Sequence, residues 1–274
     1  MSDYRLFIGR ACAGFAALAL SQPMPSALAQ SGGDGIPRMA DGRPDFTGTW
    51  DNGGGIDFVR PVADGASICI SGCGPAAGAP RGSGGPPPPP DRPSYRPAFQ
   101  ARVAALDENQ VREDPVLRCF PPGVPRIGPP DKIVQRPNEI VFLYDDVSGN
   151  FFRIIPTDGR PHRDDSEASH LGDAVGRWEG DALVVETVNF NGETWLTDDG
   201  SFHTPSLRVV ERLTRDADTL TWQATAYDPE VLAEPWEMRP RTAVPSDVEI
   251  VEAPPCIERD LEHMVDDSSH DNPR

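Results

Sequence analysis

The 274-residue chain lacks the motifs that mark the commonest enzyme classes. It has no G-x-S-x-G elbow, no phosphate-binding P-loop, no G-x-G-x-x-G ahead of a helix and no H-E-x-x-H pair. These absences remove the main support for a serine hydrolase, a nucleotide-binding enzyme or a common zinc protease. Lysine is nearly absent as well, because Lys132 is the only one in the chain. Any buried cation is therefore expected to be an arginine guanidinium, which stays charged.

Positive charge is scarce overall, and the formal net charge is −18 at pH 7. A surface of this sign repels phosphate backbones and anionic lipid headgroups, so no nucleic-acid partner and no membrane partner are expected. The expected partner is a small-molecule ligand or substrate. The sequence pattern does not set an oligomeric state.

The chain also lacks a hydrophobic run long enough to span a bilayer. Arg5 and Arg10 precede an apolar run at 11–20, and an A-L-A cleavage site follows at 27–29. An apolar run of about ten residues is too short for roughly 30 Å of hydrocarbon, so an uncleaved anchor is the less favoured alternative. Residues 1–29 are therefore predicted to be a signal peptide, and the mature protein to work in the periplasm or outside the cell.

Cysteine is rare, and its number predicts disulfide bonds. Removal of the signal peptide with Cys12 leaves four cysteines in an exported chain. Three pairings are possible. Cys69 and Cys73 are close enough to close a small loop, which leaves Cys119 with Cys256. A zinc site is the rival interpretation, but zinc ligands usually come as two short-spaced pairs and one such pair is present, so no metal is predicted.

Short β-rich runs separated by turn residues fill the chain from residue 131 onward. Gly, Asp and Asn divide successive runs, a pattern typical of an antiparallel meander. Seven or eight such strands predict an all-β fold, an antiparallel barrel of the lipocalin or calycin type, with a curved open sheet or a sandwich as the alternative. The expected runs are 139–144, 151–155, 174–179, 182–188, 207–214, 219–227, 236–243 and, as a possible last one, 248–252.

Composition divides the mature chain into one domain with loose ends. The Gly- and Pro-rich insert at 51–95 is expected to run as open loop or polyproline, without a regular strand ladder. A short strand is expected within 45–50, and an ordered loop or extended strap at 114–130. The predicted division is a disordered start at 30–44, a single β-barrel domain at 45–264 and a disordered tail at 265–274.

One short helix is predicted ahead of the barrel strands. Phe99, Val103 and Leu106 recur at helical spacing, which places them on one face of a helix over 96–107.

Strand alternation predicts an arginine and a glutamate inside the barrel. Successive side chains of a strand point to opposite faces, and both charged residues share a face with apolar neighbours. A buried carboxylate is costly unless paired, so an Arg153–Glu211 pair is expected, with solvent-facing rows under covering loops as the alternative. Arg153 would hold an anionic or enolate oxygen of a substrate, with Glu211 setting its position.

Two loops carry most of the remaining chemistry. The loop at 156–172 contains His162, and Asp173 follows it directly. Histidine titrates near neutrality, so His162 or His203 is expected to act as general base or acid, with Asp173 orienting a histidine. A solvated acidic loop that binds calcium is the alternative, although its acids lack EF-hand spacing.

A second loop at 189–203 supplies amides, an aromatic side chain and His203. Both loops flank the same predicted hairpin, so they would frame a pocket if they gather at one barrel mouth. Tryptophans could form its walls, as apolar ligand pockets require, although tryptophans in strands more often belong to the core. The predicted ligand-binding residues are Tyr144, Trp178, Asn191, Trp195, Trp222 and Arg208, and Trp236 is a further candidate wall.

Four segments of the chain are similar to one family. They are PDFTGTW at 44–50, CFPPGVPR at 119–126 after the DP at 114–115, DGRPH at 158–162 and GDAVGRWEGDALVVET at 172–187. The chain resembles a large family of secreted, mostly hypothetical proteins of proteobacteria and acidobacteria, over nearly the whole mature chain except the insert. The resemblance implies export and the Cys119–Cys256 pairing, and it assigns no activity. Arg163 departs from the family pattern, which has a proline after the histidine.

These features together predict an exported enzyme of the lyase, isomerase or hydratase type. It would act by side-chain acid–base chemistry on a small aromatic or hydrophobic molecule. No cofactor is expected, because the periplasm offers no ready supply of ATP or nicotinamide. A non-catalytic periplasmic carrier of hydrophobic ligands is the alternative, and a scaffold that uses the Pro-rich segment is a weaker one.

Overall fold

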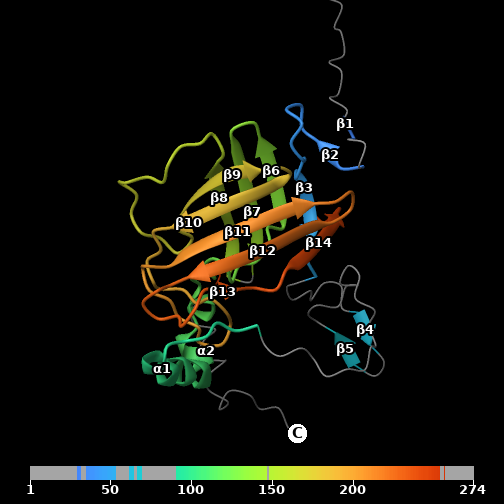
Figure 1. Cartoon of the computed structure of the whole chain (residues 1–274). Helices are drawn as coiled ribbons and strands as arrows, with labels where there is room; N and C mark the ends of the chain where they lie inside the picture. The colour runs from blue at the N-terminus through green and yellow to red at the C-terminus, as the bar shows by residue number, and fades with distance from the viewer. Residues whose placement is uncertain are drawn as a thin grey trace, which may run out of the picture.

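The protein is a nearly closed antiparallel barrel, seen in a computed structural model that describes residues 30–31, 35–53, 62–64, 67–69, 91–146, 148–253 and 256 (Figure 1). The barrel sheet runs in the order β8-β7-β6-β3-β14-β12-β11-β10-β9, and β13 pairs with β12. This order confirms the predicted all-β, lipocalin-like fold. The strands are β3 (Gly48–Asp51), β6 (Lys132–Arg136), β7 (Glu139–Asp146), β8 (Gly149–Pro156), β9 (Asp173–Glu179), β10 (Ala182–Val188), β11 (Arg208–Arg215), β12 (Leu220–Tyr227), β13 (Trp236–Glu237) and β14 (Arg241–Ser246).

The barrel closes between β8 and β9, the two strands at the ends of the sheet order. No ladder joins these two strands within the described residues, so side chains make the closure. Gly176 in β9 allows the approach, because a Cβ atom there would lie 3.0 Å from the Cγ2 atoms of Ile155 and Thr157. We call this junction of β8 and β9 the seam.

Regular alternation along the strands fills the barrel interior with side chains. In β12, Leu220, Trp222, Ala224 and Ala226 are buried, while the residues between them are partly exposed. Because strand side chains alternate, one face of β12 packs into the core and the other meets solvent. The largest fully buried side chains include Trp222, Tyr144, Phe46 and Phe142, so the described interior is a packed core.

Three predictions of strands need correction. The run predicted at 236–243 is divided into β13 and β14, which both pair with β12; Pro240 lies between them and has no N–H to donate. The run at 248–252 forms no strand, and Val248 and Val251 are exposed. β6 was not predicted, although it pairs with β3 and β7.

The start of the mature chain differs from the disorder expected at 30–44. β1 (Gln30–Ser31) pairs with β2 (Pro37–Arg38), and the Arg38 guanidinium donates two hydrogen bonds of 2.9 Å to Asp181 in the β9–β10 turn. The insert also contains β4 (Val62–Asp64) paired with β5 (Ser67–Cys69), where no ladder was expected. The predicted signal peptide and the tail at 265–274 lie outside the described residues.

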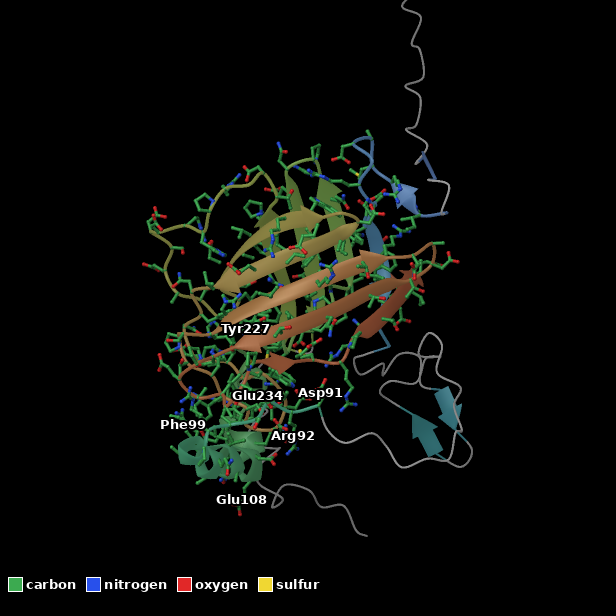
Figure 2. The ribbon with its side chains drawn as sticks, in the orientation of Figure 1. Asp91, Arg92, Phe99, Glu108, Tyr227 and Glu234 are labelled. Atoms are coloured by element: carbon green, nitrogen blue, oxygen red, sulfur yellow. A yellow bond between two sulfur atoms is a disulfide. The ribbon has the colours of Figure 1, made fainter. Side chains whose placement is uncertain are left out.

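Helical segments lie at one end of the barrel (Figure 1). α1 (Pro97–Glu108) confirms the predicted helix, and its three spaced apolar residues pack against the core. Figure 2 shows Glu108 pointing away from the barrel at the outer end of α1. α2 (Gln110–Glu113) and the 3-10 helix η1 (Pro115–Arg118) follow, and η1 lies in the 114–130 segment, where an ordered loop or extended strap was expected. Within the described part of the chain, none of the helices is long and apolar enough to cross a membrane.

A disulfide fixes the strap that follows η1. Cys119 is bonded to Cys256, as predicted. The Arg126 guanidinium adds a second constraint, because it donates two hydrogen bonds of 2.7 Å to the buried carboxylate of Asp114. The strap at 119–130 is therefore held at Cys119 and again at Arg126. The predicted Cys69–Cys73 bond lies outside the described side chains.

Candidate functional site

A cavity of about 550 Å3 lies on the outer side of the seam. β8 directs Arg153 inward, so its neighbours Phe152 and Ile154 face outward and are 63% and 51% exposed. They form one wall of the cavity. The loop that connects β8 to β9, drawn at the left of Figure 1, forms the opposite wall. Further lining residues are Pro121, Arg160, Arg163, His170 and Asp173.

Asp173, the first residue of β9, holds the loop in place. Its Oδ2 atom lies 3.0 Å from Nδ1 of His162 and accepts a 3.1 Å hydrogen bond from the Arg163 backbone N–H. Its Oδ1 atom accepts a 2.8 Å bond from Nε of Arg163. Burial alone would raise the pKa of Asp173, but the bonds from Arg163 and His162 outweigh burial and lower that pKa. The structure thus brings His162 and Asp173 together in the geometry that the predicted orienting role requires.

His162 is held between two carboxylates. Its Nε2 atom is buried, makes no hydrogen bond, and lies 3.5 Å from Oε1 of Glu186 in β10. Glu186 in turn accepts a 3.1 Å bond from Nη1 of Arg208, whose guanidinium lies 4.0 Å from the ring centroid of Tyr227. Arg208, predicted to bind ligand, is therefore occupied by Glu186 and Tyr227 on the outer face of the sheet.

His170 is the histidine that lines the cavity itself, and the sequence did not single it out. Its ring stacks on Phe120 with centroids 5.2 Å apart, and its Nε2 atom lies 3.2 Å from Oε2 of Glu193. Asn191 donates a 2.9 Å bond to the same carboxylate, so this predicted ligand-binding residue positions Glu193. The sequence signal for His170 was its place in the His- and Asp-rich loop, but its partner Phe120 comes from the distant strap.

The predicted Arg153–Glu211 pair is confirmed in the barrel interior. Nη1 and Nη2 of Arg153 donate bonds of 3.0 and 2.6 Å to the two carboxylate oxygens of Glu211, which is 0% exposed. Arg153 also donates to the hydroxyl oxygens of Tyr144 and Thr187, at 3.2 and 2.7 Å. Burial alone would lower the pKa of Arg153, but Glu211 and Tyr144 outweigh burial and raise it.

Those contacts leave the Nη atoms of Arg153 little capacity to hold a substrate oxygen, and the Nε atom, which has no partner among the described residues, is buried. Both Nη atoms are occupied by interior partners, although the residue reaches the cavity lining. Trp222 donates a 3.0 Å bond from Nε1 to Glu211, which completes the network. Arg153, Glu211 and Tyr144 therefore belong to the core, and their predicted substrate-holding and ligand-binding roles are not supported by this geometry.

The predicted aromatic wall is part of the core as well. Trp222, Trp195 and Trp236 are 0%, 4% and 6% exposed, and none of them lines the cavity. Trp178 stacks on Phe46 with ring centroids 5.5 Å apart. For Trp222 and Trp236 the cause is strand register, because inward positions of a packed barrel favour large apolar side chains.

His203 is separate from the cavity, contrary to its predicted role. It is 3% exposed, with Nε2 2.7 Å from the Thr194 hydroxyl and Nδ1 2.9 Å from the Thr204 carbonyl. Burial lowers its pKa, although the Thr204 carbonyl and Asp228 oppose the shift. Both ring nitrogens have hydrogen-bond partners inside the protein, so the surroundings of His203 fit a role in the packing of the fold.

A second cavity of about 400 Å3 lies near the start of α1, where Figure 2 labels Asp91 and Arg92. Its charged residues are largely occupied by each other. Arg92 is ion-paired with Asp199, and Nε of Arg126 donates a 2.8 Å bond to Asp198. This mutual pairing leaves few groups for a ligand, so the seam cavity is the better candidate site.

Metal ligands do not converge in the described residues, where no group of three or more His, Cys, Asp or Glu side chains could hold an ion. No protein-family model matches the chain, and no curated protein or solved structure matches it significantly. The function must therefore be inferred from the geometry of the site.

Proposed function

We propose that the protein is an exported, cofactor-independent enzyme that moves protons on a small, partly apolar molecule, as lyases, isomerases and hydratases do. The observation that carries this proposal is the 3.0 Å contact between His162 and Asp173, the second of which lines the seam cavity. When Nδ1 of a histidine donates to a carboxylate, the ring is fixed and Nε2 becomes the proton-accepting atom. His162 would then be the general base once a movement of the 156–172 loop exposes Nε2, which is buried 3.5 Å from Oε1 of Glu186, and Asp173 would be its positioning residue.

His170 supplies an imidazole that lines the cavity. Proton removal and proton return at different atoms of a substrate need two acid–base groups. Phe152 and Ile154 offer an apolar surface that displaces water from a bound substrate. His162 and His170 would therefore supply the two acid–base groups of the proposed chemistry. Phe152 and Ile154 of β8 would supply the surface on which the substrate binds.

Export is part of the same proposal. The layout at 1–29 is that of a signal peptide, and the Cys119–Cys256 bond fits an oxidising compartment. We also propose membership of the secreted family that the 172–187 block resembles. ATP and nicotinamide are not readily supplied in the periplasm, which favours chemistry by side chains alone.

Deuterium exchange tests proton transfer without knowledge of the product. The mature protein is incubated in D2O with a panel of small carbonyl and carboxylate compounds, and mass spectrometry follows deuterium uptake at carbon. We expect uptake with at least one compound, and a loss of about 100-fold or more for His162→Gln. Asp173→Asn should also lower uptake, whereas Asp165→Asn, an exposed acid of the same loop, should not. Equal uptake by the wild-type protein and by His162→Gln would contradict the proposal.

A non-catalytic periplasmic carrier is the second candidate. The exposure of Phe152 and Ile154 on the outer face of β8 favours it, because such side chains can hold an apolar ligand without any histidine. Native mass spectrometry of protein from the periplasm would report a bound ligand. Retention of that ligand by His162→Gln, with no deuterium exchange in the wild type, would favour the carrier.

A further inference from the structure

Arg163 is a fixed arginine with two unoccupied nitrogens. Its Nε atom and backbone N–H both donate to Asp173, at 2.8 and 3.1 Å. Its side chain is 65% exposed and lines the seam cavity. No residue in the described part of the chain accepts a hydrogen bond from Nη1 or Nη2 of Arg163. The guanidinium is thus held through one side, while its outer edge stays available.

Such an edge suits a carboxylate group. The Nη1 and Nη2 donors of a guanidinium form a planar fork that matches the two oxygens of a carboxylate. Asp173 already restricts the rotation of the Arg163 side chain, so less conformational entropy is lost when an anion binds. A free surface arginine would lack this preorganisation.

The rest of the cavity lining fits an anion with an apolar body. Arg160 is a second guanidinium at the cavity, held by Asp158 through Nε and Nη2. Phe152 and Ile154 form the apolar wall. Arginine therefore outnumbers carboxylate in the lining, although the chain as a whole carries a net charge of −18. Each of these arginines also pairs with a carboxylate, so the unoccupied Nη1 and Nη2 donors of Arg163, and not a net positive charge, favour an anion at this cavity.

We propose that the seam cavity selects small organic carboxylates and that Arg163 is the residue that determines this specificity. The carboxylate binds the Nη1–Nη2 edge of Arg163, and the apolar body lies on Phe152 and Ile154. This inference rests on the proposed function, since it names the substrate class of the same cavity. It concerns binding alone and requires no turnover.

Two probes of matched shape and a third without the apolar body separate the effect of charge from that of apolar contact. Isothermal titration of the mature protein is carried out with phenylacetate, its neutral isostere phenylacetamide, and acetate. We expect phenylacetate to bind at least about 10-fold more tightly than phenylacetamide, because a hydrogen bond to a charged group is stronger than one to a neutral group. Acetate, which lacks the apolar body, should bind more weakly than phenylacetate by about 10-fold or more.

Substitution of Arg163 assigns the selectivity to one residue. Arg163→Gln should reduce the phenylacetate-to-phenylacetamide affinity ratio to about 1, with the amide affinity unchanged. Arg163→Lys keeps the charge without the planar fork, so it should retain part of the ratio and serves if the glutamine variant does not fold. Arg177→Gln is the matched control, because Arg177 is an exposed β9 arginine that pairs with Glu179 away from the cavity lining.

Two results would overturn the inference: equal affinities of the wild type for phenylacetate and phenylacetamide, or an unchanged ratio in Arg163→Gln. The outcome is independent of catalysis. Carboxylate selectivity that depends on Arg163, without deuterium exchange on any compound, would support this inference and overturn the proposed enzyme. Exchange on neutral carbonyl compounds without carboxylate selectivity would support the enzyme and overturn the inference.

Discussion

Replacing Arg153 by methionine tests how strongly the barrel depends on its interior ion pair. The change removes both hydrogen bonds to Glu211 and leaves that carboxylate with only the Trp222 N–H as donor. Loss of one partner of a buried pair costs about 3–5 kcal/mol, because the remaining charge stays buried without compensation. We therefore expect the free energy of unfolding at pH 7 to fall by about 4 kcal/mol.

The same variant should acquire a pH dependence of stability in addition to that of the wild type. An unpaired buried carboxylate is relieved by taking up a proton, which costs about 1.36 kcal/mol for each pH unit above its unfolded pKa. The folded variant then binds a proton that the unfolded chain does not, so its stability falls as pH rises. Relative to wild type, Arg153→Met should recover about 2–3 kcal/mol between pH 7 and pH 5.

Urea unfolding at both pH values, with the disulfide intact and followed by tryptophan fluorescence, measures these quantities. Arg177→Met is the control, because its exposed ion pair with Glu179 should contribute less than about 1 kcal/mol. The double variant Arg153→Met with Glu211→Leu should be more stable than the single one at pH 7. A cost below about 1 kcal/mol for Arg153→Met, with no pH dependence, would refute a buried, coupled pair.

Two further predictions concern stability and pH. Burial raises the pKa of Asp131 to about 6, and neighbouring acids such as Asp145 add to the shift. The protonated form of Asp131 therefore contributes stability that is fully present below pH 3.8 and is lost as pH rises through 6. The effect of Asp131→Asn on stability should therefore be more favourable at pH 7 than at pH 4 by about 1–3 kcal/mol, although asparagine keeps only one of the two oxygens that accept from Asn52 and from the Asp145 backbone N–H. Asp164→Asn should show no such difference; thermal unfolding at both pH values checks this, and equal shifts would contradict it. Burial lowers the pKa of His203, so its neutral form contributes stability that is complete above pH 6.5 and lost as pH falls below it. In urea titrations, His203→Gln should weaken the pH dependence between 5 and 7; an unaltered slope would show that His203 does not titrate there.

Alternation along strands was enough to predict the interior of the barrel. Arg153 and Glu211 each lie among apolar residues at every second position, and both face inward. The same rule places Trp222 inside with Leu220 and Ala224, so its position in the core was also within reach of the sequence. The error was to combine an inward strand position with a role as a pocket wall.

The loops were less predictable, because no repeat relates their side chains. His162 and Asp173 are close in sequence and contact each other in the fold. His170 instead meets Phe120, whose position depends on the strap held by the Cys119–Cys256 bond. A contact between segments so far apart in the chain depends on the whole fold. The location of the cavity outside the barrel follows from the seam, which strand patterns alone do not reveal.

β8 connects the barrel interior with the seam cavity, because its two faces point into different surroundings. Arg153 faces inward and anchors β8 to β11, while Phe152 and Ile154 face outward and line the cavity. With no ladder to β9 in the described residues, β8 is held by backbone hydrogen bonds to β7 alone. Any molecule that binds only when β8 is docked raises the free energy needed to detach it, by mass action. A higher concentration of such a ligand would therefore make the barrel harder to open at β8.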